Sequence, residues 1–160
     1  MDSPILETRH DSWPDEAACA DRARMLARHD ALHDAFIELH GPLGAGKTTF
    51  VSHLLHGLGV QGSIKSPTYA LLEPYRAITP RGAFAIAHFD FYRFDDPQEW
   101  EDAGFRDVFA TKGLKLVEWP EKAEGLLPQA DVELHIEPRH GEQRHVRFDA
   151  HTPRGAGLLE

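Results

Sequence analysis

The strongest chemical signal in this chain is a glycine-rich segment at residues 41–49, which reads Gly-Pro-Leu-Gly-Ala-Gly-Lys-Thr-Thr. It follows an apolar, strand-like run at 35–39 and precedes a helix-like run at 48–56. Glycines let backbone N–H groups curl around phosphate oxygens, Lys47 supplies a mobile cation, and the Thr48 hydroxyl can complete a Mg²⁺ shell. The N-terminus of the following helix adds a partial positive charge. We therefore expect a nucleotide-phosphate site that is formed by Gly44, Ala45, Gly46, Lys47, Thr48 and Thr49.

Two acidic residues, Asp90 and Glu118, each follow an apolar run at the point where a strand should leave the core. In a mostly parallel sheet, ligands bind at the carboxyl ends of the strands, so these side chains can reach the same Mg²⁺ as the loop. A nucleotide site needs a carboxylate to hold the metal or to orient an attacking water. Spacing alone leaves the division of these roles between Asp90 and Glu118 open.

The elements that must position these residues alternate between strands and helices. We expect strands at 35–39, 68–73, 83–92, 114–119, 131–137 and 143–149, and helices at 14–28, from Thr48 to Gly57 or Gly59, and from Asp96 to Trp100. Such alternation is typical of a three-layer α/β P-loop NTPase fold, with a mostly parallel sheet flanked by helices. The last two strands predict an antiparallel hairpin at one edge.

The chain has 160 residues, which suits one domain, and we place that domain at 1–150. Residues 1–12 suggest a frayed start and 151–160 a flexible tail. A single cysteine, Cys19, excludes an internal disulfide and favours a reducing, cytoplasmic compartment, and no apolar run approaches membrane-spanning length.

The overall charge of −9 comes from 26 acidic and 17 basic side chains, and it argues against direct wrapping of a nucleic-acid backbone. Basic residues do cluster at 139–147, but acidic residues are interleaved with them. We interpret this segment as a solvated pair of strands.

Longer sequence motifs narrow the choice of protein family. Together with the glycine-rich loop, the chain contains, in order, Ser66-Pro67-Thr68-Tyr69, Glu73-Pro74-Tyr75, His88-Phe89-Asp90-Phe91-Tyr92-Arg93 and Leu116-Val117-Glu118-Trp119-Pro120. Across residues 41–138 the sequence closely resembles the bacterial TsaE family. Pro42 departs from this resemblance, because the family usually carries an acidic residue there.

This resemblance implies a small cytoplasmic P-loop ATPase of the tRNA N6-threonylcarbamoyladenosine (t6A37) pathway that uses ATP and Mg²⁺. It also implies association with TsaD- and TsaB-type partners, which transfer the threonylcarbamoyl group and handle the tRNA. Hydrolysis would be slow in the isolated protein and would reset that complex between turnovers.

The resemblance also implies roles for individual residues. Lys47 would hold the β- and γ-phosphates, Thr48 and Glu118 would hold Mg²⁺, and Asp90 would act on the metal through water or orient the nucleophile. Thr68 would belong to a segment that responds to the γ-phosphate, although from the residues alone a plain Ser-Pro turn is the simpler interpretation. Trp119 would lie beside the nucleotide.

Three other functions are compatible with parts of the sequence. A small-molecule kinase would use the same loop, but no arginine-rich lid segment stands out. A GTPase is disfavoured because the chain has no Asn-Lys-x-Asp guanine reader. An assembly factor regulated by ATP binding overlaps with the ATPase interpretation. The pair His29 and His33 has metal-protease spacing, but it lacks the required glutamate and a third ligand.

Overall fold

The structure is a computed structural model that describes residues 4–67, 69–80 and 82–160. Its strands are β1 (Glu7–Trp13), β2 (Phe36–His40), β3 (Leu72–Thr79), β4 (Gly82–Asp90), β5 (Leu114–Glu118), β6 (Val132–Pro138) and β7 (Arg144–Ala150). Its α-helices are α1 (Glu16–Ala27), α2 (Lys47–Gly57), α3 (Pro97–Asp102), α4 (Phe105–Ala110) and α5 (Pro153–Leu158). Two short 3₁₀ helices, η1 (Asp30–Asp34) and η2 (Pro120–Ala123), complete the described elements.

All seven strands form one mixed sheet in the order β1-β7-β6-β2-β5-β4-β3. The four central strands, β6, β2, β5 and β4, run parallel to one another. Antiparallel strands extend both edges, with β3 paired to β4 on one side and β7 and β1 on the other. The predicted α/β P-loop fold with a mostly parallel core and a C-terminal antiparallel hairpin is confirmed.

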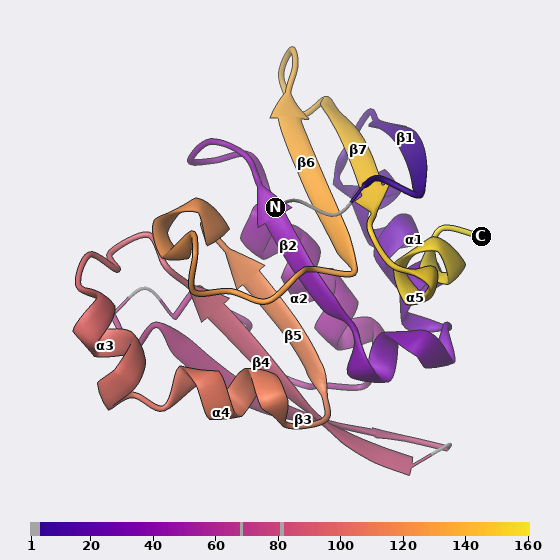
Figure 1. The fold of residues 1–160 in the computed structure, drawn as a ribbon. Coiled ribbons are helices and arrows are strands. Elements are labelled where there is room, and N and C mark those ends of the chain that lie inside the picture. The colour runs from indigo at the N-terminus through magenta and orange to yellow at the C-terminus, as the bar shows by residue number, and fades with distance from the viewer. Residues whose placement is uncertain (1–3, 68, 81) are drawn as a thin grey trace.

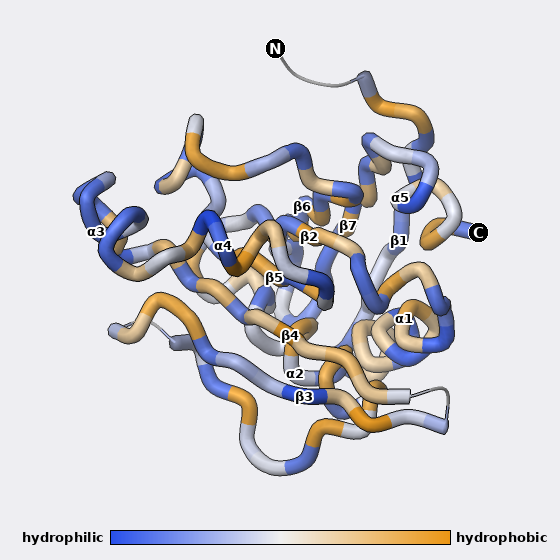
Figure 2. The backbone as a smooth tube through the Cα atoms, turned by 60° about the horizontal axis from the view of Figure 1, so that its bottom comes forward, coloured by the Kyte–Doolittle hydropathy of each residue, from blue (hydrophilic) through white to orange (hydrophobic). Residues whose placement is uncertain are grey.

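Helices cover the two faces of the sheet unequally (Figure 1). On one face, α1 and α2 pack on β2, β5, β6 and β7 in a core that includes Leu39, Phe50 and Leu134. On the other face, α3, α4 and η2 cover β4 and β5 with an aromatic cluster that includes Phe89 and Trp100. The hydropathy colouring in Figure 2 shows both hydrophobic and hydrophilic residues along α1, whereas α3 is largely hydrophilic. None of the described helices is long and apolar enough to cross a bilayer.

The register of the central strands brings the predicted site residues to one edge. Leu39 at the end of β2 pairs with Glu118 on β5, and Glu118 pairs with Asp90 on β4. The glycine-rich loop leaves the sheet directly after His40, at the same edge. Parallel pairing therefore places the loop and both carboxylates together although they are far apart in sequence.

The amino-terminal segment differs from its prediction. Residues 7–13 form the edge strand β1, which pairs with β7 from Glu7 to Trp13, where a frayed start was expected. Helix α1 begins at Glu16, with the Asp15 carboxylate accepting from the Ala18 N–H at 3.0 Å. Sequence patterning missed β1 because its residues are mostly polar, and its order comes from pairing with β7.

The strand before β4 is longer than predicted and lies further along the chain. Strand β3 runs from Leu72 to Thr79, not from 68 to 73. It pairs antiparallel with β4, with Leu72 opposite Phe89 and Thr79 opposite Gly82. Pro74 lies within β3, which is tolerated because β3 is an edge strand.

The expectation of a flexible tail at 151–160 is wrong for the described structure. Thr152 caps helix α5 by accepting from the Gly155 N–H at 3.0 Å, and it donates to Asp131 at 2.6 Å. Leu158 and Leu159 are only 3% and 5% exposed. Burial of these two leucines outweighs the low helix propensity of the glycines in this segment.

Docking of α5 generates a stability prediction. Replacing Leu158 by Ala should lower the free energy of unfolding by about 2–4 kcal/mol, because it removes buried apolar surface and leaves a cavity. Met25→Ala is the matched control: Met25 is 46% exposed, and the cost should stay within about 0.5 kcal/mol. Urea denaturation of both variants measures the difference, and equal stability of Leu158→Ala and the unmodified chain would contradict docking of α5.

Candidate phosphate-binding site

The glycine-rich loop joins β2 to α2 in a conformation that depends on its glycines. Gly41, Gly44 and Gly46 have φ angles of +150°, +78° and +104°, a region that side-chain-bearing residues rarely adopt. A Cβ atom on Gly41 would lie 2.6 Å from the carbonyl oxygen of Ile136 on β6, so this position also needs glycine for space. Pro42 lacks an N–H, but its carbonyl accepts from the Ala45 N–H at 3.1 Å and closes a turn at the start of the loop.

A cavity of about 360 Å³ lies over this loop at the N-terminus of α2. Its lining brings together all the predicted site residues that the structure describes: Gly44, Ala45, Gly46, Lys47, Thr48, Thr49, Asp90, Glu118 and Trp119. Thr68, the remaining predicted residue, lies outside the described residues. The first N–H groups of a helix have no acceptor within the helix, so those of α2 are free to bind an anion here.

Thr48 and Glu118 form the polar centre of the cavity. The Thr48 hydroxyl lies 2.9 and 3.0 Å from the two carboxylate oxygens of Glu118 and donates to them. Glu118 is 2% exposed and therefore needs donors to compensate for its lost hydration. A hydroxyl and a carboxylate at a helix N-terminus are an oxygen donor set of the kind that Mg²⁺ prefers, so these residues fit the metal that the sequence implies.

His88 is a site residue that sequence reasoning did not identify. Its Nε2 lies 2.6 Å from the Glu118 carboxylate, and the imidazole is fully buried. It therefore holds the Glu118 carboxylate together with Thr48, which makes it a positioning residue. The sequence feature that could have identified His88 is its position two residues before Asp90 on β4, because alternate residues of a strand share one face.

Asp90 is held by the chain on both sides of it. The Ser66 hydroxyl donates to one carboxylate oxygen, and the Tyr92 N–H donates to the other at 2.9 Å. Asp90 is 4% exposed and borders the cavity. The segment around Ser66 is therefore linked to the same cavity as the glycine-rich loop.

Lys47 lies folded back onto its own loop. Its Nζ donates to the Gly41 carbonyl at 2.6 Å and lies 3.5 Å from the centre of the Trp119 ring. Burial lowers the pKa of Lys47, and the carboxylates of Glu118, Glu121 and Asp90 oppose that shift. Trp119 has a φ of +57°, a strained conformation for a bulky residue, and strain of this kind is often found at functional sites.

Arg144 corrects the interpretation of residues 139–147 as a purely solvated pair of strands. Its Nε donates to the Ala45 carbonyl at 2.9 Å, so β7 contacts the glycine-rich loop. Arg144 also borders a second cavity of about 240 Å³, which shares Ala45, Gly46 and Thr49 with the first and is lined further by Trp13. The alternating charges of this segment could not show which one faces inward.

Together, the strand–loop–helix unit and the carboxylates at the adjacent strand ends define an α/β protein of the P-loop class. A family model described as "Threonylcarbamoyl adenosine biosynthesis protein TsaE" matches residues 13–146. The chain belongs to the TsaE family.

Individual relatives agree with this assignment. A Haemophilus influenzae protein named tRNA threonylcarbamoyladenosine biosynthesis protein TsaE is 42% identical over 123 residues, covering 77% of this chain and 75% of its own length. A Bacillus subtilis protein of the same name is 36% identical over 114 residues, covering 71% of this chain and 68% of its own. The crystal structure of Bacillus subtilis YdiB superposes with a TM-score of 0.77 at 25% identity, covering 98% of this chain and 95% of that one.

The contact between His88 and Glu118 generates a second prediction. Replacing His88 by Leu keeps a side chain of similar volume but leaves the buried Glu118 carboxylate with one donor fewer. The free energy of unfolding should therefore fall by about 1–3 kcal/mol. His140→Leu is the control, because His140 is exposed in the turn between β6 and β7. If chemical denaturation gives the two variants equal stability, the contact does not hold Glu118.

Proposed function

We propose that this chain is a Mg²⁺-dependent ATPase that acts in tRNA threonylcarbamoyladenosine biosynthesis by coupling its nucleotide state to a partner complex. The observation that carries the proposal is the pairing of Thr48 with Glu118 at the glycine-rich loop, where phosphate and metal ligands meet. The names of the relatives supply the pathway.

The residues that would bind phosphate, metal and water have separate roles in this proposal. The N–H groups of residues 44–49 bind the phosphates, and the Lys47 ammonium exchanges the Gly41 carbonyl for a phosphate oxygen. Thr48 and Glu118 would hold Mg²⁺, which neutralises charge on the β- and γ-phosphates when bound. Asp90 accepts a hydrogen bond from the attacking water and so orients it. The Ser66 hydroxyl donates to the Asp90 carboxylate and fixes its position.

The second cavity is the place we assign to the base. It shares Gly46 and Thr49 with the first cavity and is also lined by Trp13. Trp13 stacks on Phe50 with ring centres 5.8 Å apart, and its Nε1 donates to Asp11 at 3.1 Å, so the indole is held in place. The missing guanine-reading motif favours adenine as the base.

Exposed apolar residues near the mouth of the phosphate cavity support a partner surface. Leu43 and Tyr92, which border the cavity, are 66% and 38% exposed, and Tyr69 is 86% exposed. The Arg93 guanidinium lies 4.8 Å from the centre of the Tyr69 ring. A partner that contacts these residues would respond to whether nucleotide is bound in the adjacent phosphate cavity. TsaD- and TsaB-type proteins are the partners that we propose, and they would carry the tRNA, in agreement with the acidic charge of this chain.

The function is tested by measuring ATP turnover by the isolated chain and by the chain mixed with its TsaD- and TsaB-type partners. We expect slow turnover alone and faster turnover in the mixture. A chain that neither binds ATP nor joins the partners would refute the proposal. Robust phosphorylation of a metabolite would replace it with the kinase alternative.

The metal-binding role predicts a specific defect in Glu118→Ala. Turnover at saturating Mg²⁺ should fall by about two orders of magnitude, because the Mg²⁺ that neutralises charge on the phosphates would lose one of its ligands. Nucleotide binding in EDTA should change little, since the loop amides and Lys47 remain. Glu124→Ala is the control, because Glu124 is an exposed carboxylate that follows η2. Equal losses in turnover and in metal-free binding would show that Glu118 supports the fold instead.

A further inference from the structure

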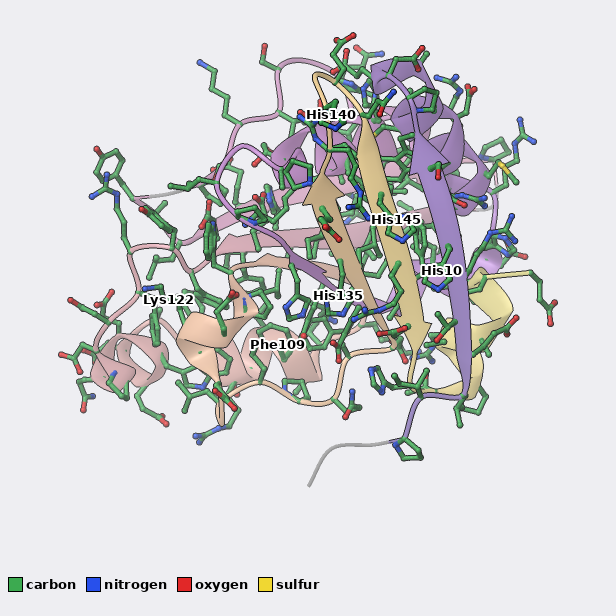
Figure 3. The ribbon with its side chains drawn as sticks, turned by 90° about the horizontal axis from the view of Figure 1, so that it is seen from above. His10, Phe109, Lys122, His135, His140 and His145 are labelled. Atoms are coloured by element: carbon green, nitrogen blue, oxygen red, sulfur yellow. The ribbon has the colours of Figure 1, made fainter. Side chains whose placement is uncertain are left out.

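A polar face of the sheet lies away from the phosphate cavity. Strands β2, β6, β7 and β1 direct residues such as Leu39, Leu134 and Phe148 into the core with α1 and α2, and the residues between them point to the other side. Figure 3 looks onto this second face, where His135, His145 and His10 lie on β6, β7 and β1 in front of the helices. Here the strands carry imidazoles and carboxylates where a covered sheet would carry apolar side chains.

Register places three of these side chains in one group. His40 is paired with His135 across β2 and β6, and Glu133 lies two residues before His135 on the same face. Their donor atoms all lie within 4.8 Å of one another. The two rings stack with centres 4.6 Å apart, so both imidazoles approach the group from the same side of the sheet.

The distances from the carboxylate to the two imidazoles are close to those between ligands of one metal ion. The Glu133 Oε2 atom lies 3.4 Å from the His135 Nε2 and 3.7 Å from the His40 Nε2. Bonds of about 2.0–2.1 Å in tetrahedral geometry place neighbouring ligand atoms about 3.3 Å apart. The His135 Nε2 is buried and has no hydrogen-bond partner among the described residues, although carboxylates lie nearby.

Three further side chains surround the group. His151 reaches the second oxygen of Glu133 at 2.8 Å. Glu38 lies 3.1 Å from the His40 Nε2, and Asp149 lies 3.6 Å from the His135 Nε2. His151 can orient the Glu133 carboxylate, whereas Glu38 and Asp149 face the ring nitrogens themselves and add negative charge around a cation bound there.

We propose that His40, Glu133 and His135 bind a divalent transition-metal ion, with Zn²⁺ as the best match. Two imidazoles and one carboxylate suit zinc better than Mg²⁺ or Ca²⁺, which prefer oxygen ligands alone. Three protein ligands leave a fourth position, and it faces a cavity of about 850 Å³ lined by these residues and by Glu38, Asp149 and His151. A water molecule or an anion from solution completes the coordination there.

This site is separate from the phosphate cavity but adjoins it in sequence. His40 is the last residue of β2, and Gly41 begins the glycine-rich loop. The metal joins β2 to β6 where the backbone at Gly41 packs against Ile136. Its ligands are imidazole and carboxylate, whereas the phosphate cavity offers a hydroxyl and carboxylates.

The test is a calorimetric titration of the tag-free full chain with Zn²⁺ in the presence of excess Mg²⁺. We expect one Zn²⁺ per chain, and an affinity at least about tenfold weaker in His135→Gln and in Glu133→Gln. His145→Gln is the matched control, because His145 lies on the same face, and its ring contacts His10 at 3.2 Å and is not part of the proposed ligand group. Glu118→Ala should also bind Zn²⁺ normally, because it alters only the phosphate cavity.

The site is refuted if the unmodified chain binds no Zn²⁺, if His135→Gln and Glu133→Gln bind it normally, or if His145→Gln or Glu118→Ala weakens binding equally. A second measurement avoids dependence on variants that fail to fold. Co²⁺ added to the unmodified chain should give the intense visible absorption of a four-coordinate site, and addition of Zn²⁺ should remove it. The weak spectrum of hexaaqua Co²⁺ would show that the group is only a network of ion pairs on the sheet surface.

Discussion

The hydrogen bond between Thr48 and Glu118 joins two segments that are 70 residues apart, and the phosphate cavity depends on it. It exists because β2 and β5 are parallel neighbours, so the residue that ends β5 arrives beside the helix that follows β2. Glu118 is buried, so hydrogen-bond donors must replace its lost hydration, and Thr48 and His88 provide them. The same geometry that satisfies this carboxylate produces an oxygen pair at the N-terminus of α2. Stability and function therefore place the same demand on these residues.

The sequence predicted the central part of the molecule because its signals there are local. A glycine-rich loop between strand and helix specifies its own conformation, and apolar runs that end in Asp90 or Glu118 indicate strand ends. The family resemblance then supplied roles that spacing could not. The edges were predicted less well: β1 is a polar strand ordered by its partner, and α5 is a glycine-containing helix ordered by two buried leucines. Both depend on contacts more than 100 residues away in sequence, which local patterns cannot encode.

In the phosphate cavity, too, residues with a local sequence signal were predicted and residues that depend on distant contacts were missed. His88 and Arg144 were missed as contributors because each acts through a contact fixed only by strand register. The histidines of the open sheet face, spread from His10 to His151, gave no motif, since their proximity arises from pairing between β2, β6, β7 and β1. One sheet therefore carries two kinds of chemistry. At one edge, hydroxyl and carboxylate oxygens suit a nucleotide-bound cation, and on the open face, imidazoles and a carboxylate suit a transition metal.

We propose that the loop, Thr48 and Glu118 form one site for nucleotide and metal. A crystal structure of the chain with Mg²⁺ and a non-hydrolysable ATP analogue tests this most directly. We expect the phosphates on the N–H groups of residues 44–49, with the metal bound by the Thr48 hydroxyl and the Glu118 carboxylate. A nucleotide bound elsewhere, or a metal held by other residues while Glu118 still bonds only to Thr48 and His88, would contradict it.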